Sequence, residues 1–485
     1  MLKKLLLSLV LIIGALLSIA LVRTLMHSAP EPTVNVGVTA DIDGEAAINN
    51  LAASIRFKTI SHQDKEKFSP QEFEGFIKWA ALTYPEFHQA TQLEQLGYSL
   101  LFKWEGRDTN LAPILFEGHH DVVPIIPGSE ELWEEQPFAG VISNNRIWGR
   151  GTLDDKSGVI GLMEAATYLI KNNFQPKRTV YFAFGHDEEV GGSGAALITE
   201  KLRNEGIQLY WSLGEGSFVN KGFFPGIDKF IAPINVAEKG SANLLIVATA
   251  KGGHSSTPPK KTAVNILADA LIKLENEPLP GSLEGLSAVM FDEVSKHMPF
   301  GYRFLFANRW LFGGLLDSQM SSTPVINAMI RTTTAPTMLS GSIKSNVLPI
   351  EATALINFRL HPRDSIESVT EHVRRVVGFD QVEVRTLGGR EASEISSWDS
   401  PGFEVISNSL EKVFDEIVSV PGLMIAASDT RHYSEVADNS FRFNPFSIVP
   451  EDMTGIHGTN ESIDVDSFVA GIKTYVEIIK EGSSN

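Results

Sequence analysis

Three short apolar runs, each about as long as a buried strand, restrict this chain to an α/β fold. The runs cover residues 112–116, 179–184 and 209–213, and acidic or histidine side chains follow each of them closely. Such runs, flanked by glycine and polar residues, are typical of strands in a mainly parallel sheet. Ligands bind outside the carboxyl ends of such strands. We therefore expect these polar segments to meet at one edge of the sheet.

The order of predicted elements indicates two interleaved domains. Strands alternate with helices, such as 157–171, over residues 45–234, which is typical of an α/β domain with helices on both faces of its sheet. The pattern then becomes strand, helix, strand, strand, helix, strand, the order of a ferredoxin-like α+β domain. These elements are expected at 243–250, 262–274, 325–333, 352–359, 365–377 and 381–385. The α/β pattern returns near 388, with a helix at 403–414. We predict a discontinuous domain of residues 45–234 and 388–485 that carries an inserted domain, 235–387.

The N-terminus carries an uncharged apolar stretch, Leu5 to Val22, which follows Lys3 and Lys4. Its length suits a membrane-spanning helix, and the lysines favour a cytoplasmic N-terminus. We predict a signal-anchor over residues 1–26, with the rest of the chain on the periplasmic or extracellular side. A cleaved signal peptide, and thus a secreted protein, is the alternative. Residues 27–44 lack a periodic apolar face and are expected to form a linker.

The composition excludes several kinds of site. Acidic residues outnumber basic ones by 59 to 41, a net charge of −18, which argues against a nucleic-acid partner. The chain has no cysteine, so disulfides, thiolate ligands and a cysteine nucleophile are excluded. Any metal here has only nitrogen and oxygen donors.

Five segments carry the donors that a metal site needs: His119-His-Asp121, Asp154-Asp155-Lys156, Asp187-Glu188-Glu189, Gly214-Glu215-Gly216 and His457. A metal-bound imidazole usually gives its other N–H to a carboxylate, which suits His119 and Asp121. Two adjacent carboxylates repel one another, so metal binding by one of the pair Glu188–Glu189 would leave the other as a general base. Two histidines and three carboxylates suit a two-zinc site, with Mn or Co as alternatives. The alternatives without a metal are solvent-facing histidines, an N-capping Asp154 and a solvated acidic turn.

In this order the segments resemble those of a zinc exopeptidase family. The family includes aminoacylases, acetylornithine deacetylase, succinyl-diaminopimelate desuccinylase and carboxypeptidase S. The resemblance implies that one zinc is bound by His119, Asp154 and Glu215, and the other by Asp154, Glu189 and His457. It also implies that Glu188 is the catalytic base, that Asp121 orients His119, and that the Asp154–Asp155 peptide is cis.

Further motifs resemble the branch of carboxypeptidase S and the N-fatty-acyl-amino acid synthase/hydrolases. They lie at residues 236–240, 253–259, 330–334, 346–349, 357–362 and 429–432. This resemblance implies that His254 polarises the scissile carbonyl, while Asn346 and Arg359 hold the substrate carboxylate. Arg431 is a further candidate for anion binding. The alternatives are a satisfied surface histidine for His254 and an ordinary salt bridge for Arg359.

An insertion near residues 278–323 interrupts the inserted domain, and its part from Met298 to Met320 is rich in aromatic residues. We advance the hypothesis that this part helps to form a groove for a long acyl chain. Core packing or a subunit contact is the favoured alternative, because large apolar patches also mark interfaces.

Together these features predict a membrane-anchored, two-zinc metallohydrolase that cleaves an amide bond next to a free carboxylate. The expected substrates are N-acyl amino acids or short peptides, and the reverse condensation is an extension of the same chemistry. The alternatives are a dipeptidase or aminopeptidase of the same family, or a non-catalytic metal-binding receptor. The inserted domain is expected to act as a lid and to offer a contact for a homodimer.

Overall fold

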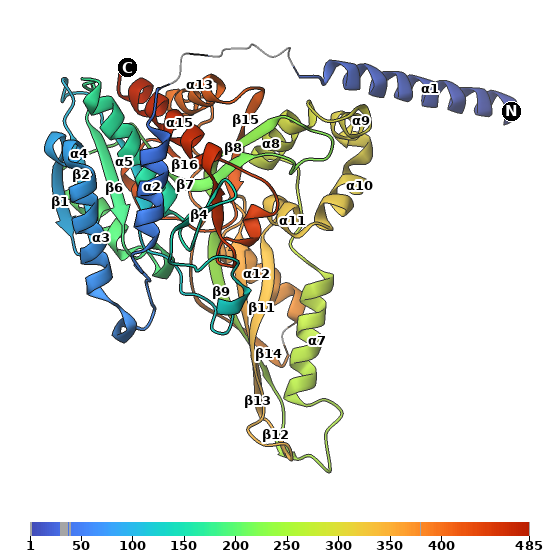
Figure 1. Cartoon of the computed structure of the whole chain (residues 1–485). Coiled ribbons are helices and arrows are strands. Elements are labelled where there is room, and N and C mark those ends of the chain that lie inside the picture. Colours follow the sequence, from blue (N-terminus) through green and yellow to red (C-terminus); the bar gives the residue numbers. More distant parts are fainter. Residues whose placement is uncertain (1, 30–36, 38–39, 379, 485) are drawn as a thin grey trace.

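The computed structural model describes residues 2–29, 37, 40–378 and 380–484 (Figure 1). The main body is built on an eight-stranded sheet in the order β1-β2-β6-β3-β7-β16-β8-β15. The strands are β1 (Gln92–Leu96), β2 (Ser99–Trp104), β3 (Ile114–His119), β6 (Val180–Gly185), β7 (Trp211–Asn220), β8 (Phe230–Glu238), β15 (Ile417–Met424) and β16 (Ser440–Ile448). The four central strands, β6, β3, β7 and β16, are parallel, whereas β1, β2 and the β16–β8 pair are antiparallel. The sheet is therefore mixed, and the expected parallel arrangement holds for its centre.

Helices cover both faces of this sheet, as predicted. Phe116 and Phe182 pack into the core beneath one set of helices, whereas their neighbours Leu115 and Tyr181 pack with the helix on the opposite face. This alternation follows from the two-residue period of a strand and explains why the runs are apolar without interruption. The first face carries α2 (Gly44–Ile55), α4 (Pro85–Ala90), α5 (Lys156–Lys171), α13 (Pro401–Val413) and α15 (Val465–Ser484); the second carries α6 (Ser193–Asn204). The remaining elements of the main body are α3 (Pro70–Thr83), α14 (Thr430–Tyr433) and a small sheet of β4 (Val141–Ser143), β5 (Arg146–Trp148) and β17 (Ser462–Asp464).

A second unit projects from the main body (Figure 1). This projecting unit contains β9 (Gly240–Thr249), α7 (Ala263–Asn276), β11 (Thr333–Ser340), β13 (Glu351–Leu360), α12 (Ile366–Val377) and β14 (Val382–Arg390). Its antiparallel sheet has the order β11-β13-β9-β14 and packs against α7 and α12 around its own apolar core. The short strands β10 (Gly253–His254) and β12 (Val347–Leu348) pair at its tip (Figure 1). The element order is the one expected, while the role of a lid stays a prediction.

One strand prediction in this part of the chain is wrong. Residues 325–333 were expected to be extended, but α11 (Pro324–Ile330) occupies most of them and the strand begins at Thr333. Pro324 stands at the first helical position, where its missing N–H costs nothing. Ile326, Met329 and Ile330 have the spacing of one helix face and pack in a shared core.

A helical insertion, α8 (Gly285–Ser295), α9 (Phe300–Ala307), α10 (Arg309–Ser321) and α11, separates α7 from β11. It does not join the core of the projecting unit. Phe291, Phe306 and Leu316 instead pack with Ile231 of β8 and Val420 of β15 in a separate core. Part of the aromatic segment is therefore core, which was the favoured alternative.

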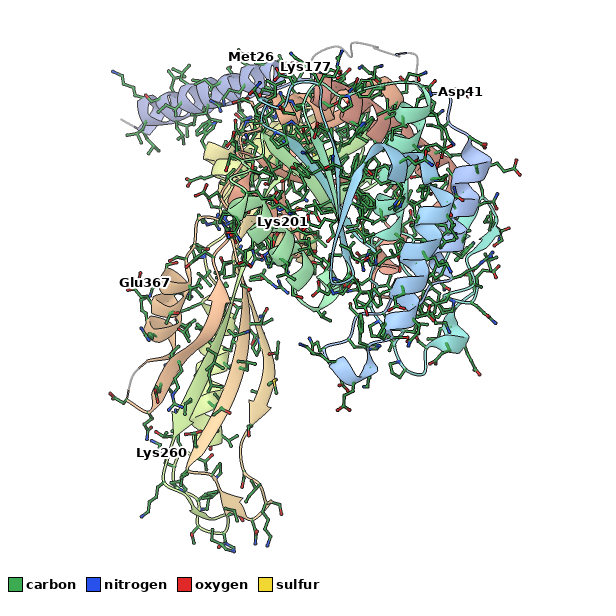
Figure 2. All side chains as sticks on the ribbon, turned by 90° about the vertical axis from the view of Figure 1, so that its left-hand side faces the viewer. Met26, Asp41, Lys177, Lys201, Lys260 and Glu367 are labelled. Atoms are coloured by element: carbon green, nitrogen blue, oxygen red, sulfur yellow. The ribbon has the colours of Figure 1, made fainter. Side chains whose placement is uncertain are left out.

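The apolar stretch at the N-terminus forms α1 (Leu2–Met26). Among the described residues it is the one helix long and apolar enough to cross a membrane, a test that a signal sequence also passes. Half of the expected linker, residues 27–44, lies outside the described residues, which omit 30–36, 38 and 39. Met26 and Lys260, which is near the tip of the projecting unit, lie at opposite ends of the molecule (Figure 2).

Candidate active site

His119, at the end of β3, lies among three carboxylates. Its Nε2 is 3.0 Å from Oδ1 of Asp154 and 3.3 Å from Oε2 of Glu215, and its Nδ1 is 3.3 Å from Oδ1 of Asp121. Burial lowers the pKa of His119, but the charge of Glu215 and hydrogen bonds to the other carboxylates outweigh it, so the pKa lies well above its ordinary value. The predicted contact between His119 and Asp121 is therefore present.

Asp154 lies between two imidazoles that are more than 300 positions apart in the sequence. Its Oδ1 faces His119, while its Oδ2 is 3.1 Å from Nε2 of His457. The same His457 nitrogen is 3.0 Å from Oε2 of Glu189. Burial raises the pKa of Asp154, but the two histidines outweigh this and lower it. The carboxylate thus has the placement that a bridging ligand needs, and the peptide bond that follows it is cis, as expected.

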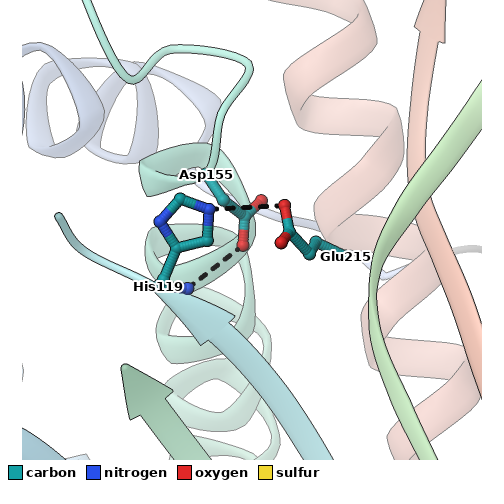
Figure 3. Close-up of side chains that lie close together, drawn as sticks. All are labelled: His119, Asp155 and Glu215. Atoms are coloured by element: carbon teal, nitrogen blue, oxygen red, sulfur yellow. Dashed lines mark hydrogen bonds and ion pairs between the residues drawn. The ribbon is translucent and has the colours of Figure 1, made fainter. Parts of the chain in front are cut away.

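Among the residues that the structure describes, two groups of donors could each hold a metal ion, and both include His119. One consists of His119, Asp154 and Glu189, and the other of His119, Asp155 and Glu215 (Figure 3). Asp155 is already engaged, because its Oδ2 accepts the backbone N–H of His119 at 3.4 Å and its Oδ1 accepts from Asn444 at 3.1 Å. Both oxygens of Asp154 instead face histidines, which favours Asp154 as the shared ligand.

Asp121 also holds the turn that carries Glu188 and Glu189. Its Oδ1 accepts the backbone N–H of Glu188 at 3.2 Å, and its Oδ2 accepts that of Glu189 at 3.3 Å. The Ser61 hydroxyl donates to the same carboxylate at 2.6 Å. A single buried aspartate therefore positions both His119 and the acidic pair, a second function that its sequence position did not indicate.

Glu188 and Glu189 have different surroundings. Oε1 of Glu188 is 3.6 Å from Nη1 of Arg431, so Arg431 does join the cluster. Burial and the nearby charge of Glu215 raise the pKa of Glu188 well above its ordinary value. Burial and Asp154 also raise the pKa of Glu189, whose Oε1 is buried with no hydrogen-bond partner among the described residues. Crowded buried carboxylates with an unpartnered oxygen, beside two imidazoles, fit a site for divalent cations.

Sequence reasoning missed a buried ion pair that supports the cluster. Oε1 of Glu461 accepts the backbone N–H groups of Gly151, Leu153 and Asp154 at 3.0, 2.8 and 3.2 Å, and its Oε2 accepts from Arg150 at 2.6 Å. Arg150 also donates to the carbonyl of Gly458, next to His457, at 2.6 Å. The pair thus connects the loop of Asp154 to the loop of His457. No feature of the sequence distinguished Glu461 from other acidic residues in polar loops.

Asp429 is a second residue that sequence reasoning passed over, although its motif was noted. Its carboxylate is buried, and neither oxygen has a hydrogen-bond partner among the described residues. Burial, and then the neighbouring Glu117, raises its pKa well above the ordinary value. Nη2 of Arg431 lies 3.9 Å from Oδ1 of Asp429, so Asp429 and Glu188 share the charge of one guanidinium.

The three predicted residues of the inserted domain lie on the projecting unit, apart from this cluster. His254 is exposed, and its Nδ1 lies 2.8 Å from the hydroxyl of Ser256. Asn346 is its neighbour at the tip, where the Asn346 carbonyl accepts from Ser255 at 3.2 Å. Arg359 is exposed on β13, near the other end of the sheet. Within the described part of the chain none of the three contacts the metal-ligand cluster, and their roles stay predictions.

Comparison with known families identifies the chain. The model of peptidase family M20/M25/M40 matches residues 115–481. The chain belongs to this family. It is therefore a hydrolase of the M20 metallopeptidases, which use divalent metals, typically zinc. The family and branch that the motifs resembled are confirmed.

Relatives and solved structures agree with this assignment. The chain is 36% identical to a probable carboxypeptidase S-like protein of Dictyostelium discoideum, over 97% of this chain and 92% of the relative. It is 37% identical to an N-fatty-acyl-amino acid synthase/hydrolase of Mus musculus, over 90% and 87%. A metallo-carboxypeptidase of the M20 family from Sulfolobus solfataricus has the same fold, with a TM-score of 0.64 at 18% identity, over 90% of this chain and 98% of that one.

Proposed function

We propose that this chain is a two-zinc hydrolase that cleaves the amide bond next to a free carboxylate, in an N-acyl amino acid or at the C-terminus of a short peptide. The observation that carries the proposal is the placement of Asp154 between His119 and His457, with Glu188 beside them. Two relatives are named as a carboxypeptidase S-like protein and an N-fatty-acyl-amino acid synthase/hydrolase. Both names refer to an amide bond on the nitrogen of an amino acid. In both cases the leaving group is an amine on a residue with a free carboxylate.

The donor set suits two ions. His119, Asp154 and Glu215 would hold one, and Asp154, Glu189 and His457 the other, with Mn or Co as alternatives to zinc. When bound, zinc supplies Lewis acidity toward a carbonyl and lowers the pKa of water. Asp121 supports both sets, because it contacts His119 and accepts from the backbone of Glu188 and Glu189.

Glu188 carries the proton transfer in this proposal. It takes a proton from the water that attacks the scissile carbonyl and gives that proton to the departing amine. A general base that must also act as an acid works best with a pKa near the operating pH. Arg431 keeps the carboxylate oriented and offers a second charge for an anionic substrate.

The projecting unit supplies the rest of the site as a lid. His254 would polarise the carbonyl oxygen, and Asn346 and Arg359 would bind the substrate carboxylate. Because His254 and Asn346 are exposed at the tip, they reach a cluster only by movement of the projecting unit or from a second copy in a homodimer. We further propose that α1 anchors the chain with its catalytic part outside the cytoplasm, and that cleavage after α1 would release it as a secreted enzyme.

A substrate panel with zinc-loaded protein tests the proposal. The panel contains N-acetyl-phenylalanine, N-oleoyl-phenylalanine, N-oleoyl-phenylalaninamide and the dipeptide Phe-Phe, with released product measured by mass spectrometry. We expect at least one N-acyl amino acid to be cleaved and the amide-capped analogue to be cleaved at least 100-fold more slowly. Preference for the free-amine dipeptide would instead indicate a dipeptidase, and bound zinc without any turnover a metal-binding receptor. Preference for the acetyl over the oleoyl substrate would contradict the acyl-groove hypothesis.

A further inference from the structure

We propose that the helical insertion rests on a lipid bilayer beside α1, as a second membrane contact of the folded enzyme. The observation is a surface of α9 and the first half of α10 whose exposed side chains are apolar except for one phenol; the exposed polar residues Ser318 and Gln319 lie beyond it, in the last turns of α10. The exposed residues between 299 and 315 are Pro299, Phe300, Gly301, Tyr302, Trp310, Leu311, Gly314 and Leu315. Phe300, Trp310 and Leu315 remain 48%, 52% and 57% exposed. This set of residues is the apolar patch.

Two polar residues at the start of α10 have partners away from the patch. Arg309 pairs with Asp292 of α8 at 2.8 Å, and Asn308 is fully buried. Phe306 and Leu316 fill the core beneath the two helices. Over residues 299–315 one side of the two helices therefore packs inward, and the exposed residues are apolar apart from Tyr302. Contiguous exposed apolar patches on proteins mark sites of contact with another protein or a membrane.

Contacts with α1 indicate what covers the patch. The Asn308 side-chain amide, between α9 and α10, donates to the carbonyl of Ala20 at 3.1 Å and to Oγ1 of Thr24 at 3.2 Å. Nε of Arg23 donates to the carbonyl of Ala307 at 3.0 Å. Ala20 and Thr24 are the buried residues of α1, whose other side chains are exposed and largely apolar. The last two turns of α1 are therefore fixed to the junction of α9 and α10.

This attachment determines the level of the patch relative to a bilayer. If α1 spans the membrane, its last turns lie at the interface, and α9 and α10 are held at the same level (Figure 1). Trp and Tyr are enriched at that level, and amphipathic helices lie there with their apolar side in the acyl region. Trp310, Tyr302, Leu311 and Leu315 match this composition. The patch is continuous with an apolar helix that needs lipid itself, so a bilayer is the occupant that the contacts favour.

The absence of cysteine allows a site-specific test on the full chain. Trp310→Cys and Leu315→Cys, each spin-labelled, are reconstituted into phosphatidylcholine vesicles and compared with a matched control, Leu82→Cys, from an exposed apolar position on α3. Collision rates are measured with oxygen, which concentrates in lipid, and with a water-soluble nickel chelate. We expect labels 310 and 315 to collide with the nickel chelate at least fivefold less than label 82, and with oxygen more.

Two results would overturn the inference. Equal access of the nickel chelate to labels 310, 315 and 82 would show that the patch faces water. Shielding of 310 and 315 from both reagents, together with a dimer in sedimentation, would show that a second copy covers it. A cooperative thermal unfolding transition at the wild-type temperature confirms that the labelled variants are folded. The collision rates do not depend on turnover, so failure of the proposed reaction and failure of the membrane contact are distinguishable.

Discussion

Glu188 and Glu189 offer a matched pair of substitutions, because glutamine at either position removes one negative charge from the same turn. Oε2 of Glu189 is 3.0 Å from His457, on the side of Asp154, whereas Glu188 faces Arg431 at 3.6 Å. Among the described residues Glu188 contacts neither histidine of the cluster. We expect Glu188→Gln to keep its metal and lose turnover, and Glu189→Gln to lose metal first.

The size of the effect follows from the role assigned to Glu188. General acid–base catalysis contributes about 10²–10⁴-fold, so we expect kcat of Glu188→Gln to fall by that factor with KM little changed. At about 1.4 kcal/mol per tenfold, this corresponds to roughly 3–5.5 kcal/mol of transition-state stabilisation. Because burial among like charges raises the pKa of Glu188, its ionised form destabilises the metal-free protein at neutral pH. The neutral amide should therefore raise the melting temperature of the metal-free protein.

Three measurements on each variant check this reasoning: metal content by mass spectrometry, kcat and KM with an N-acyl amino acid, and melting temperature with and without a chelator. Equal loss of metal from Glu188→Gln and Glu189→Gln would refute the division of roles. A kcat of Glu188→Gln within fivefold of wild type would refute the assignment of the base.

Three further outcomes are expected. Glu461→Gln leaves the charge of buried Arg150 uncompensated, so it should destabilise the protein by about 3–5 kcal/mol in chemical denaturation; a loss below 1 kcal/mol would contradict a supporting role. Arg359→Leu changes an exposed side chain, so stability should stay within about 0.5 kcal/mol, while KM for an N-acyl amino acid rises at least tenfold and turnover of its amide-capped analogue is unchanged. His361 is buried, and burial is the main reason that its pKa in the folded protein is lowered to about 3. The neutral imidazole therefore stabilises the fold. This stabilisation is complete above the pKa of histidine in the unfolded chain, near 6.5, and is lost as the pH falls. That loss should reach about 2 kcal/mol at pH 5, and a pH series of unfolding should show a shallower acid slope for His361→Gln.

The predicted ligand cluster could be read from the sequence because it depends on a general property of sheets. His119 ends β3 and Glu189 follows the neighbouring parallel strand β6, so the two residues meet at one edge. Glu215 was expected to follow a strand as well, but β7 continues to Asn220 and Glu215 lies within it. A glycine next to Glu215 allows close packing there, because a Cβ on Gly216 would lie 2.3 Å from the backbone of Arg442.

The supporting contacts could not be predicted in this way. Arg150 and Glu461 are 311 positions apart, and each stands in a loop where a charged residue is ordinary. Their pairing depends on how the loops that carry Asp154 and His457 fold against one another. The distance between His254 and the cluster could not be predicted either, because the order of motifs in a sequence does not indicate whether two domains are open or closed.

The aromatic segment marks a different limit of sequence reasoning. An apolar side chain in a helical pattern is equally consistent with a protein core, a subunit interface and lipid, since all three remove it from water. The structure divides this segment by direction: Phe306 and Leu316 point into a core, while Phe300, Trp310 and Leu315 point outward. Only the hydrogen bonds of Asn308 to α1 then distinguish lipid from another protein as the partner of the outward set. If that partner is lipid, α1 and the insertion hold the enzyme by one end, and the tip with His254 and Asn346 stays directed into water, free to move toward the metal site.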